Sequence, residues 1–276
     1  GTFSEMGGIS GIGFDNNGKV RGAMGIDIAR FQNDDTLGVG IGNFANEMIA
    51  LYVSTPNNQL LFTDNAITEG VGPDSRLLLK FGLFFFDYDL DGWQDLLTSN
   101  GHLEEEIAKV QKSQAYAQSA QLFWNCGGTP AKGGFAVVDS GKAGLDLFKP
   151  IVGRGSAFAD IDTDGDLDVV FTQLHGKPLL LRNDQALNNH WLRVKLVGSS
   201  ANREGIGSIV RLTSEDFTQW RLVTPVRSYM SQSETVVTFG LGEDPKKIEL
   251  EVLWPGGSEQ ILSVSNFNTT ILVKEP

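Results

Sequence analysis

Short apolar runs separated by Gly, Asn and Pro turns recur along the chain, and almost no stretch shows the period of a regular amphipathic helix. Runs such as "IALYVS" (Ile49–Ser54), "FGLFFF" (Phe81–Phe86) and "QLFWNC" (Gln121–Cys126) have the length and the aromatic and β-branched content of strands. Because successive side chains of a strand point to opposite faces, most of these aromatic residues are expected in cores. The pattern predicts an all-β protein.

A repeat organises the first two thirds of the chain. The stretch "FFFDYDLDGWQDLL" (Phe84–Leu97) returns as "AFADIDTDGDLDVV" (Ala157–Val170) with its aspartates in the same phase, and an altered third copy reads "DIARFQNDDTLGVG" (Asp27–Gly40). Each copy is followed by a strand-like run and by a tail of Phe, polar residues and Gly. Units of roughly 60 residues built from several short strands are typical of propeller blades. The repeat therefore predicts about three blades.

The phase of the repeat also predicts a partner. The chain opens on "TFSEMGG" (Thr2–Gly8), which has the pattern of a blade's closing tail. Propellers close with about 4–8 blades, so about three blades form only part of one. Open sheet edges invite pairing with another chain. We therefore expect upstream blades or another subunit to complete the propeller.

One stretch differs from the strand-like pattern. The residues "HLEEEIAKVQKSQAYAQSAQ" (His102–Gln121) contain no Gly or Pro and are rich in Ala, Glu, Gln and Lys, which predicts a helical insertion. Its apolar face, formed by Leu103, Ile107 and Val110, is thin, so we expect the insertion to lie on the surface. It would be either a decorated loop or a helix that docks a partner.

The repeat stops near "NNHWLRVKLVG" (Asn188–Gly198). After it come alternating or β-branched runs, such as "GSIVRLT" (Gly207–Thr213) and "TVVTFGLG" (Thr235–Gly242), separated by Gly, Asn and Pro turns. This change predicts propeller blades over residues 1–187 and a small β-sandwich over residues 188–276.

The two intact acidic loops have the ligand pattern of a calcium site. Both place carboxylates at positions 1, 3, 5 and 9 and Gly at position 6, and the backbone carbonyl at position 7 would add a ligand. An EF-hand is excluded, because position 12 is Thr98 in one loop and Phe171 in the other instead of Glu, and because the flanks are strand-like. The predicted ligands are Asp87, Asp89, Asp91, Trp93 and Asp95 in the first loop, and Asp160, Asp162, Asp164, Asp166 and Asp168 in the second.

The third copy has lost this ligand set. Arg30, Gln32, Asp34 and Gly38 stand where the first intact loop has its four aspartates. One carboxylate survives, and a cationic side chain already lies among the replacements. We expect this loop to bind no calcium, and Arg30 to reach Asp34 or another acceptor instead.

Composition narrows the function further. A net charge of −12 and a pI near 4.7 argue against nucleic acid or an anionic membrane as partner and favour cations. The single Cys126 excludes an internal disulfide framework, and no apolar run approaches the roughly 20 residues of a membrane span. We find no nucleophile elbow, phosphate loop or histidine cluster, and therefore name no catalytic residue.

The motifs together resemble a known family. The Asp-x-Asp-x-Asp-Gly-x-x-Asp turns are similar to FG-GAP/VCBS propeller repeats, including those of integrin α-subunits. The segments "NHWLRVKLVGSSANREGIGSIVRL", "SYMSQSE", "FGLG" and "WPGG" resemble the ASPIC/UnbV domain. In this order they resemble the cartilage acidic protein and UnbV-like family. The resemblance implies a calcium-bearing propeller followed by a β-sandwich, exported to an extracellular, cell-surface or periplasmic location, with any signal upstream of this chain.

These observations predict a non-enzymatic, calcium-binding scaffold or protein-interaction module that forms part of a larger propeller or assembly. Two alternatives stay open. The loop residue Trp93 and neighbouring aromatics would suit a carbohydrate-binding adhesin with a glycan ligand, because exposed rings stack on sugars. The chain would otherwise be an enzymatic or accessory component of a biosynthetic pathway, which requires a deep pocket of titratable groups outside the calcium loops.

Overall fold

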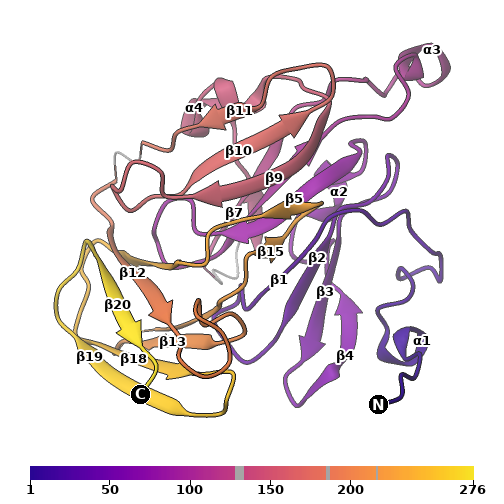
Figure 1. The fold of residues 1–276 in the computed structure, drawn as a ribbon. Helices are drawn as coiled ribbons and strands as arrows, with labels where there is room; N and C mark the ends of the chain where they lie inside the picture. The colour runs from indigo at the N-terminus through magenta and orange to yellow at the C-terminus, as the bar shows by residue number, and fades with distance from the viewer. Residues whose placement is uncertain (128–133, 185–186, 216) are drawn as a thin grey trace.

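The computed structural model describes residues 1–127, 134–184, 187–215 and 217–276 (Figure 1). Three antiparallel sheets follow one another along the repeat region, each formed by strands in sequence order. The first contains β1 (Ile26–Ala29), β2 (Gly38–Ile41), β3 (Ala50–Thr55) and β4 (Asn58–Asp64). The second contains β5 (Lys80–Phe86), β6 (Asp95–Asn100), β7 (Gln121–Asn125) and β8 (Phe135–Val137). The third contains β9 (Gly153–Ala159), β10 (Asp168–Gln173) and β11 (Leu179–Leu181).

Two further sheets form the C-terminal part. One has the order β17–β12–β20, in which β12 and β20 are parallel, and the other has the order β14–β13–β18–β19. A small hairpin, β15–β16, lies against β9 of the third repeat sheet. The strands are β12 (His190–Val197), β13 (Ile209–Thr213), β14 (Thr218–Leu222), β15 (Val226–Arg227), β16 (Ser231–Gln232), β17 (Val237–Gly242), β18 (Ile248–Leu253), β19 (Glu259–Val264) and β20 (Thr269–Lys274).

The two C-terminal sheets share a single hydrophobic core. Leu192 of β12 and Phe239 of β17 pack against Val210 of β13 and Leu250 of β18, all fully buried. In β18 the buried Ile248, Leu250 and Val252 alternate with more exposed residues, as expected of a strand in a sandwich. The boundary placed between residues 187 and 188 stays a prediction.

The all-β class is confirmed, but the sheet count differs from the prediction. Five sheets of three or four strands lie in a propeller-like arrangement, rather than about three blades followed by a detached unit. The reason is that the C-terminal sheets pack against the repeat sheets. Ile26 of β1 forms a β-bridge with Ser228, and the buried Arg227 of β15 forms an ion pair with Asp27 of β1.

The predicted helical insertion is wrong for most of its length. Among the described residues, helix occurs only in single turns: α1 (Gly7–Ser10), α2 (Gly72–Ser75), α3 (Ile107–Val110), α4 (Ser140–Ala143) and the 3-10 turn η1 (Asp146–Phe148). In the stretch from 102 to 121, Ile107 is buried while Leu103 and Val110 are exposed, so no apolar face stabilises a longer helix. Backbone bridges of Gly101 to Ala117 and of Gln118 to Ile151 hold the segment as a loop instead.

The phenylalanine strand lies between neighbouring sheets, as its alternation predicts. Phe85 of β5 faces the first sheet and stacks on Phe31, with ring centroids 5.8 Å apart. Phe84 and Phe86 point to the opposite side and pack against Phe158 of β9 in the third sheet. All three phenylalanines, Phe84, Phe85 and Phe86, are buried. β5 therefore packs against the first sheet on one side and against the third sheet on the other. The first acidic loop begins where this strand ends.

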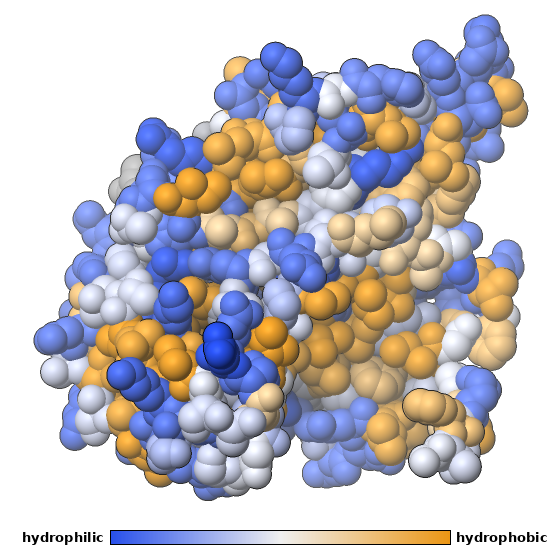
Figure 2. Space-filling model, in the orientation of Figure 1, coloured by the Kyte–Doolittle hydropathy of each residue, from blue (hydrophilic) through white to orange (hydrophobic). Residues whose placement is uncertain are grey.

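Apolar side chains also gather on one free face of the first sheet. Figure 2 shows them over β1–β3 on the side turned to the viewer. Val39 and Tyr52 lie within this cluster, partly covered by Ile12 of the N-terminal segment, and Ile26 is 49% exposed beside it.

No helix among the described residues is long and apolar enough to cross a membrane.

Candidate metal centre

The two intact acidic sequences form the same kind of turn. One connects β5 to β6 and the other connects β9 to β10, and in each hairpin the residue before position 1 pairs with the aspartate at position 9. Position 4 has a positive φ in both loops (Leu90 and Thr163), and so does the glycine at position 6 (Gly92 and Gly165, φ 95° and 104°). Glycine suits position 6 because other residues rarely adopt this conformation. The backbone thus repeats as closely as the sequence.

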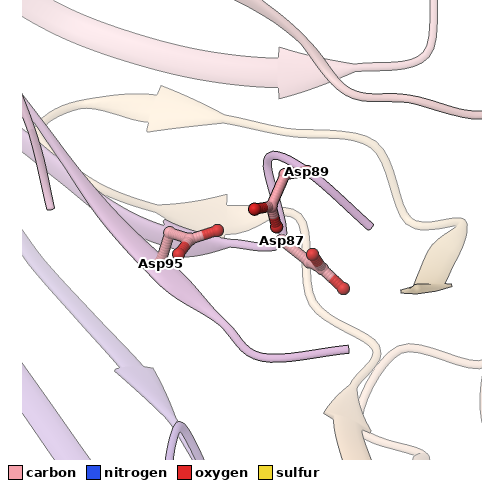
Figure 3. A group of neighbouring side chains, drawn as sticks. All are labelled: Asp87, Asp89 and Asp95. Carbon is pink, nitrogen blue, oxygen red and sulfur yellow. The ribbon is translucent and has the colours of Figure 1, made fainter. Parts of the chain in front are cut away.

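Three carboxylates converge in each turn. Asp87, Asp89 and Asp95 each place one oxygen within 4.8 Å of the others, as do Asp160, Asp162 and Asp168. Figure 3 shows Asp89, on the loop, and Asp95, on β6, pointing toward each other with Asp87 close by. Either group could hold a metal ion.

The aspartate at position 9 is anchored in the same way in both loops. Asp95 accepts backbone N–H bonds from Tyr88 (2.9 Å) in its own loop and from Asn125 (2.7 Å) at the end of β7. Asp168 accepts the equivalent bonds from Ile161 (2.9 Å) and Asn183 (2.8 Å). Both carboxylates are buried. Position 9 therefore ties the loop to the next strand of its own sheet.

The aspartate at position 1 of the first loop keeps one oxygen unpaired. Asp87 Oδ2 accepts the backbone N–H of Gly92 (3.0 Å) and of Gly240 in β17 (3.2 Å). Its Oδ1 is buried and has no hydrogen-bond partner, and the same is true of Asp89 Oδ1. Buried polar oxygens are normally satisfied, and leaving one unpaired costs about 1–3 kcal/mol. Two unpaired acceptors in one acidic group are therefore available as ligands for a metal ion.

Charge crowding in the first loop leads to the same conclusion. Burial, followed by the charges of Asp91 and Asp89, raises the pKa of Asp87 well above its usual range. Burial, with the three other aspartates next in importance, does the same to the pKa of Asp95, and burial and then Asp89 raise the pKa of Asp91 to about 7. Ionised carboxylates are unfavourable here unless a cation compensates them.

The second loop is more open and already contains a cationic side chain. Asp160 Oδ1 accepts the N–H of Thr163 (2.7 Å), and its Oδ2 lies 2.8 Å from the guanidinium of Arg193 on β12. The Asp162 side chain is 38% exposed and lies 4.0 Å from Arg182. The aspartate at position 1 of this loop therefore has both oxygens engaged.

The remaining predicted ligands lie outside the two converging groups. Asp91 Oδ1 accepts the N–H of Trp93 (2.8 Å), and Asp164 Oδ1 accepts that of Asp166 (3.3 Å), so both carboxylates stabilise the turn itself. Trp93 is half-buried and Asp166 is buried. Metal ligation by Asp91 and Asp164, and by the carbonyls of Trp93 and Asp166, stays a prediction.

The third, altered loop has the contact expected of Arg30. Its guanidinium donates to the backbone carbonyl of Asp34 (3.4 Å) and lies 3.9 Å from the Asp35 carboxylate. It also lies over the ring of Trp220, 4.9 Å from the centroid. The Asp34 carboxylate accepts the N–H of Thr36 (2.8 Å) instead of meeting further acids. That this loop holds no calcium stays a prediction.

Two asparagines that follow the repeat's third strand were missed by the sequence analysis. Asn125 donates its side-chain amide to the carbonyl of Phe31 in the preceding sheet (2.8 Å), and Asn183 donates to the carbonyl of Tyr88 (2.8 Å). Phe31 and Tyr88 occupy the same position of successive repeats. The sequence signal that could have identified them is the Asn that ends both "QLFWN" and "LLLRN", at the same place in two repeats. These residues link neighbouring sheets and anchor position 9 as well.

Three cationic residues of the C-terminal part were also missed. Arg227 binds Asp27 (2.9 Å), Arg193 binds Asp160, and Arg221 lies 4.0 Å from Asp87. Each crosses from the C-terminal part to an aspartate of a different repeat sheet or of the loop that follows it. Nothing in the sequence spacing pairs residues so far apart.

Comparison with known proteins gives a family match for the C-terminal segment and several similar proteins. Residues 198–276 match the family described as ASPIC and UnbV. Cartilage acidic protein 1 of Xenopus tropicalis is 33% identical over 111 residues, and the human protein is 32% identical over 111 residues. Each match covers 38% of this chain and 16% of the relative, so the chain spans a small part of their length. The suspected kinship is confirmed: residues 198–276 form an ASPIC and UnbV domain, and the chain resembles the cartilage acidic protein and UnbV-like family.

Proposed function

We propose that this chain is a non-enzymatic, calcium-stabilised interaction module. The observation that supports this most strongly is the first acidic loop, where Asp87 Oδ1 and Asp89 Oδ1 are buried without partners beside Asp95. A cation bound there would satisfy both oxygens and remove the repulsion that raises the pKa values of these carboxyls.

The donor set favours calcium over other metals. Both groups offer carboxylate oxygens without sulfur or imidazole, which suits hard cations and not zinc or copper. Magnesium requires a near-ideal octahedron and retains its waters, whereas calcium accepts six to eight oxygens in flexible geometry. Positions 1, 3, 5, 7 and 9 supply five ligand groups in one turn, and a bidentate carboxylate or water molecules would complete the set.

Bound calcium would rigidify the junction between the sheets. The first loop follows β5, which packs between two other sheets, and Asp87 accepts an N–H from Gly240 of the C-terminal part. Fixing this loop holds three sheets and the ASPIC/UnbV domain in one arrangement. The module would then present a rigid surface to a partner.

We place this module outside the cytoplasm, in an extracellular, cell-surface or periplasmic setting. Calcium sites of extracellular modules have dissociation constants of about 10⁻⁴–10⁻³ M, which match the calcium concentrations found there. The similarity to cartilage acidic proteins is in keeping with this location.

Calcium titration with a matched pair of variants tests the proposal. Asp89→Asn removes a charge from the first loop, and Asp244→Asn removes one from an exposed site outside both loops. Isothermal titration calorimetry should show calcium binding in the unmodified protein and in Asp244→Asn, with at least tenfold weaker binding at one site in Asp89→Asn. An absence of calcium binding in the unmodified protein would remove the basis of the proposal.

We also propose that one face of the first sheet docks another sheet of the same propeller, supplied by an upstream blade or another subunit. On this face Ile28 and Ile41 are half-buried beside the buried Val39 and Tyr52, and the curated relatives are several times longer than the region they share with this chain. The chain alone should self-associate through this face, and Ile41→Lys should reduce the association in sedimentation velocity. A monomer at all concentrations would contradict the idea.

The two rival functions lack a supporting site. Trp93 is half-buried and its ring lies against Gly127, so the described residues present no open aromatic platform there for a sugar. A cavity of about 570 Å³ lies between the second and third repeat sheets and is lined mainly by apolar residues such as Leu122 and Val169. Its titratable lining residues are Tyr88, Lys142, Arg182 and Asp184, and Arg182 is paired with Asp184. The described lining contains no histidine, cysteine or serine, the residues that most often act as catalytic base or nucleophile.

A further inference from the structure

The second acidic loop differs from the first in what its position-1 aspartate binds. Asp160 corresponds to Asp87, and each uses one carboxylate oxygen for a loop N–H. The other oxygen accepts no hydrogen bond in either loop, but that of Asp160 lies 2.8 Å from Arg193 Nη1 and forms an ion pair with it. The oxygen that a metal would take in the first loop is therefore already bound to a cation in the second.

Arg193 is firmly placed for this contact. It is nearly buried on β12, its Nε donates to Thr238 Oγ1 on β17 (3.2 Å), and its Nη2 forms an ion pair with Glu234. Glu234 in turn accepts the backbone N–H of Asp160 (3.2 Å). The guanidinium thus bridges two carboxylates, one from the loop and one from the C-terminal part.

The equivalent arginine of the first loop does not reach its aspartate. Arg221 Nη2 stays 4.0 Å from Asp87 Oδ2 and donates to Gln219 Oε1 (2.9 Å) instead, while Nε donates to the Thr238 carbonyl (3.0 Å). Arg193 enters from the β17–β12–β20 sheet and Arg221 from the β14–β13–β18–β19 sheet, and they differ in reach. Among the described residues, a guanidinium is in close contact with the position-1 aspartate in the second loop and more distant in the first.

We infer that Arg193 is a built-in competitor of calcium at the second loop. Calcium that takes Asp160 Oδ2 must displace the guanidinium, which then stays on Glu234 alone. The second loop therefore binds calcium more weakly than the first, and its filling is coupled to the position of the ASPIC/UnbV domain. This inference rests on the proposed calcium function.

Two tryptophans give a separate signal for each loop. The indole of Trp191 lies directly on Gly165 of the second loop, where a Cβ atom would come within 2.3 Å of the ring. Trp93 is part of the first loop. Terbium, a calcium substitute whose luminescence nearby tryptophans sensitise, would report the two loops separately when Trp191→Phe and Trp93→Phe are compared.

The deciding experiment is a terbium titration of the full chain with three variants. Arg193→Met removes the competitor and should tighten binding at the second loop at least tenfold, without changing the first. Glu234→Gln removes the guanidinium's other partner and should weaken binding at the second loop. Arg211→Met, which removes an arginine paired with Glu251 away from both loops, should change neither.

The outcomes separate failure of the inference from failure of the function. No terbium binding at either loop of the unmodified protein would refute the calcium function itself. Binding at both loops that Arg193→Met leaves unchanged, or weakens at the second loop, would overturn the competition. If Arg193→Met does not fold, Arg193→Lys decides the question. Lysine keeps the charge but not the forked contact, so it should tighten the second loop by a smaller factor, and no change would contradict the inference.

Discussion

The two acidic loops have the same backbone, the same spacing and the same anchor at position 9, yet they differ in charge balance. The first loop is buried and leaves Asp87 Oδ1 and Asp89 Oδ1 unpaired. The second is more open, and Arg193 already neutralises Asp160. Repeated sequence therefore fixes the shape of a site, while residues from a distant part of the chain decide how strongly it needs a metal.

The largest expected effect concerns the feature that the loops share. Asp95→Ala removes the acceptor of two buried backbone N–H groups, each of which costs about 1–3 kcal/mol when unsatisfied. We expect a loss of about 2–5 kcal/mol in the free energy of unfolding in chelator, measured by urea denaturation. Asp168→Ala, which removes the matching bonds, should cost a similar amount. A loss below about 1 kcal/mol in both would show that position 9 is no anchor.

Calcium should separate the two loops. At a concentration 100 times the dissociation constant, one site contributes about 2.7 kcal/mol of stability. Asp89→Asn should lose most of the calcium-dependent rise in melting temperature, whereas Asp162→Asn, at the same position of the open second loop, should lose less. Equal losses would mean that Arg193 makes no difference between the sites.

The pH dependence of the metal-free protein should report the first loop. The folded-state pKa values of Asp87, Asp91 and Asp95 lie above the usual value of about 3.8 for an aspartate, chiefly because the groups are buried, and that of Asp91 is about 7. The folded protein therefore holds more protons than the unfolded chain, and stability should fall as pH rises from about 4 through about 7. Calcium, which binds the ionised carboxylates, should reduce this fall. Thermal unfolding in chelator measures the effect, and Asp91→Asn should flatten the curve.

The smallest expected effect is in the altered third loop. Arg30→Ala removes a contact with the Asp34 carbonyl and a position over Trp220, worth about 0.5–1 kcal/mol together. The calcium-dependent change in melting temperature should stay the same, because we expect no ion there. An altered calcium response in this variant would place the third loop among the metal sites.

The sequence predicted what local patterns determine. Alternation placed Phe84 and Phe86 on one side of β5 and Phe85 on the other, and the phase of the aspartates predicted both turns. Composition gave the wrong prediction for residues 102–121. Residues that favour helix do not form a long helix when it has no apolar face to bury, and the β-bridges near both ends of this segment hold it as a loop instead.

Long-range partners were beyond the reach of such patterns. Arg193 reads in the sequence as one polar position of an alternating strand, and only the packing of β12 beside the third repeat sheet brings it to Asp160. The same holds for Arg227 and Asp27, which join the C-terminal hairpin to the first sheet. For this reason the sequence did not predict the contacts that join the C-terminal sheets to the repeat sheets.

The most direct test of the central claim is anomalous diffraction from crystals of the full chain grown with a few millimolar calcium. We predict a calcium peak in the first loop, about 2.3–2.6 Å from oxygens of Asp87 and Asp89, and a weaker peak or none in the second loop, where Arg193 remains on Asp160. An empty first loop beside a fully occupied second loop would contradict the account.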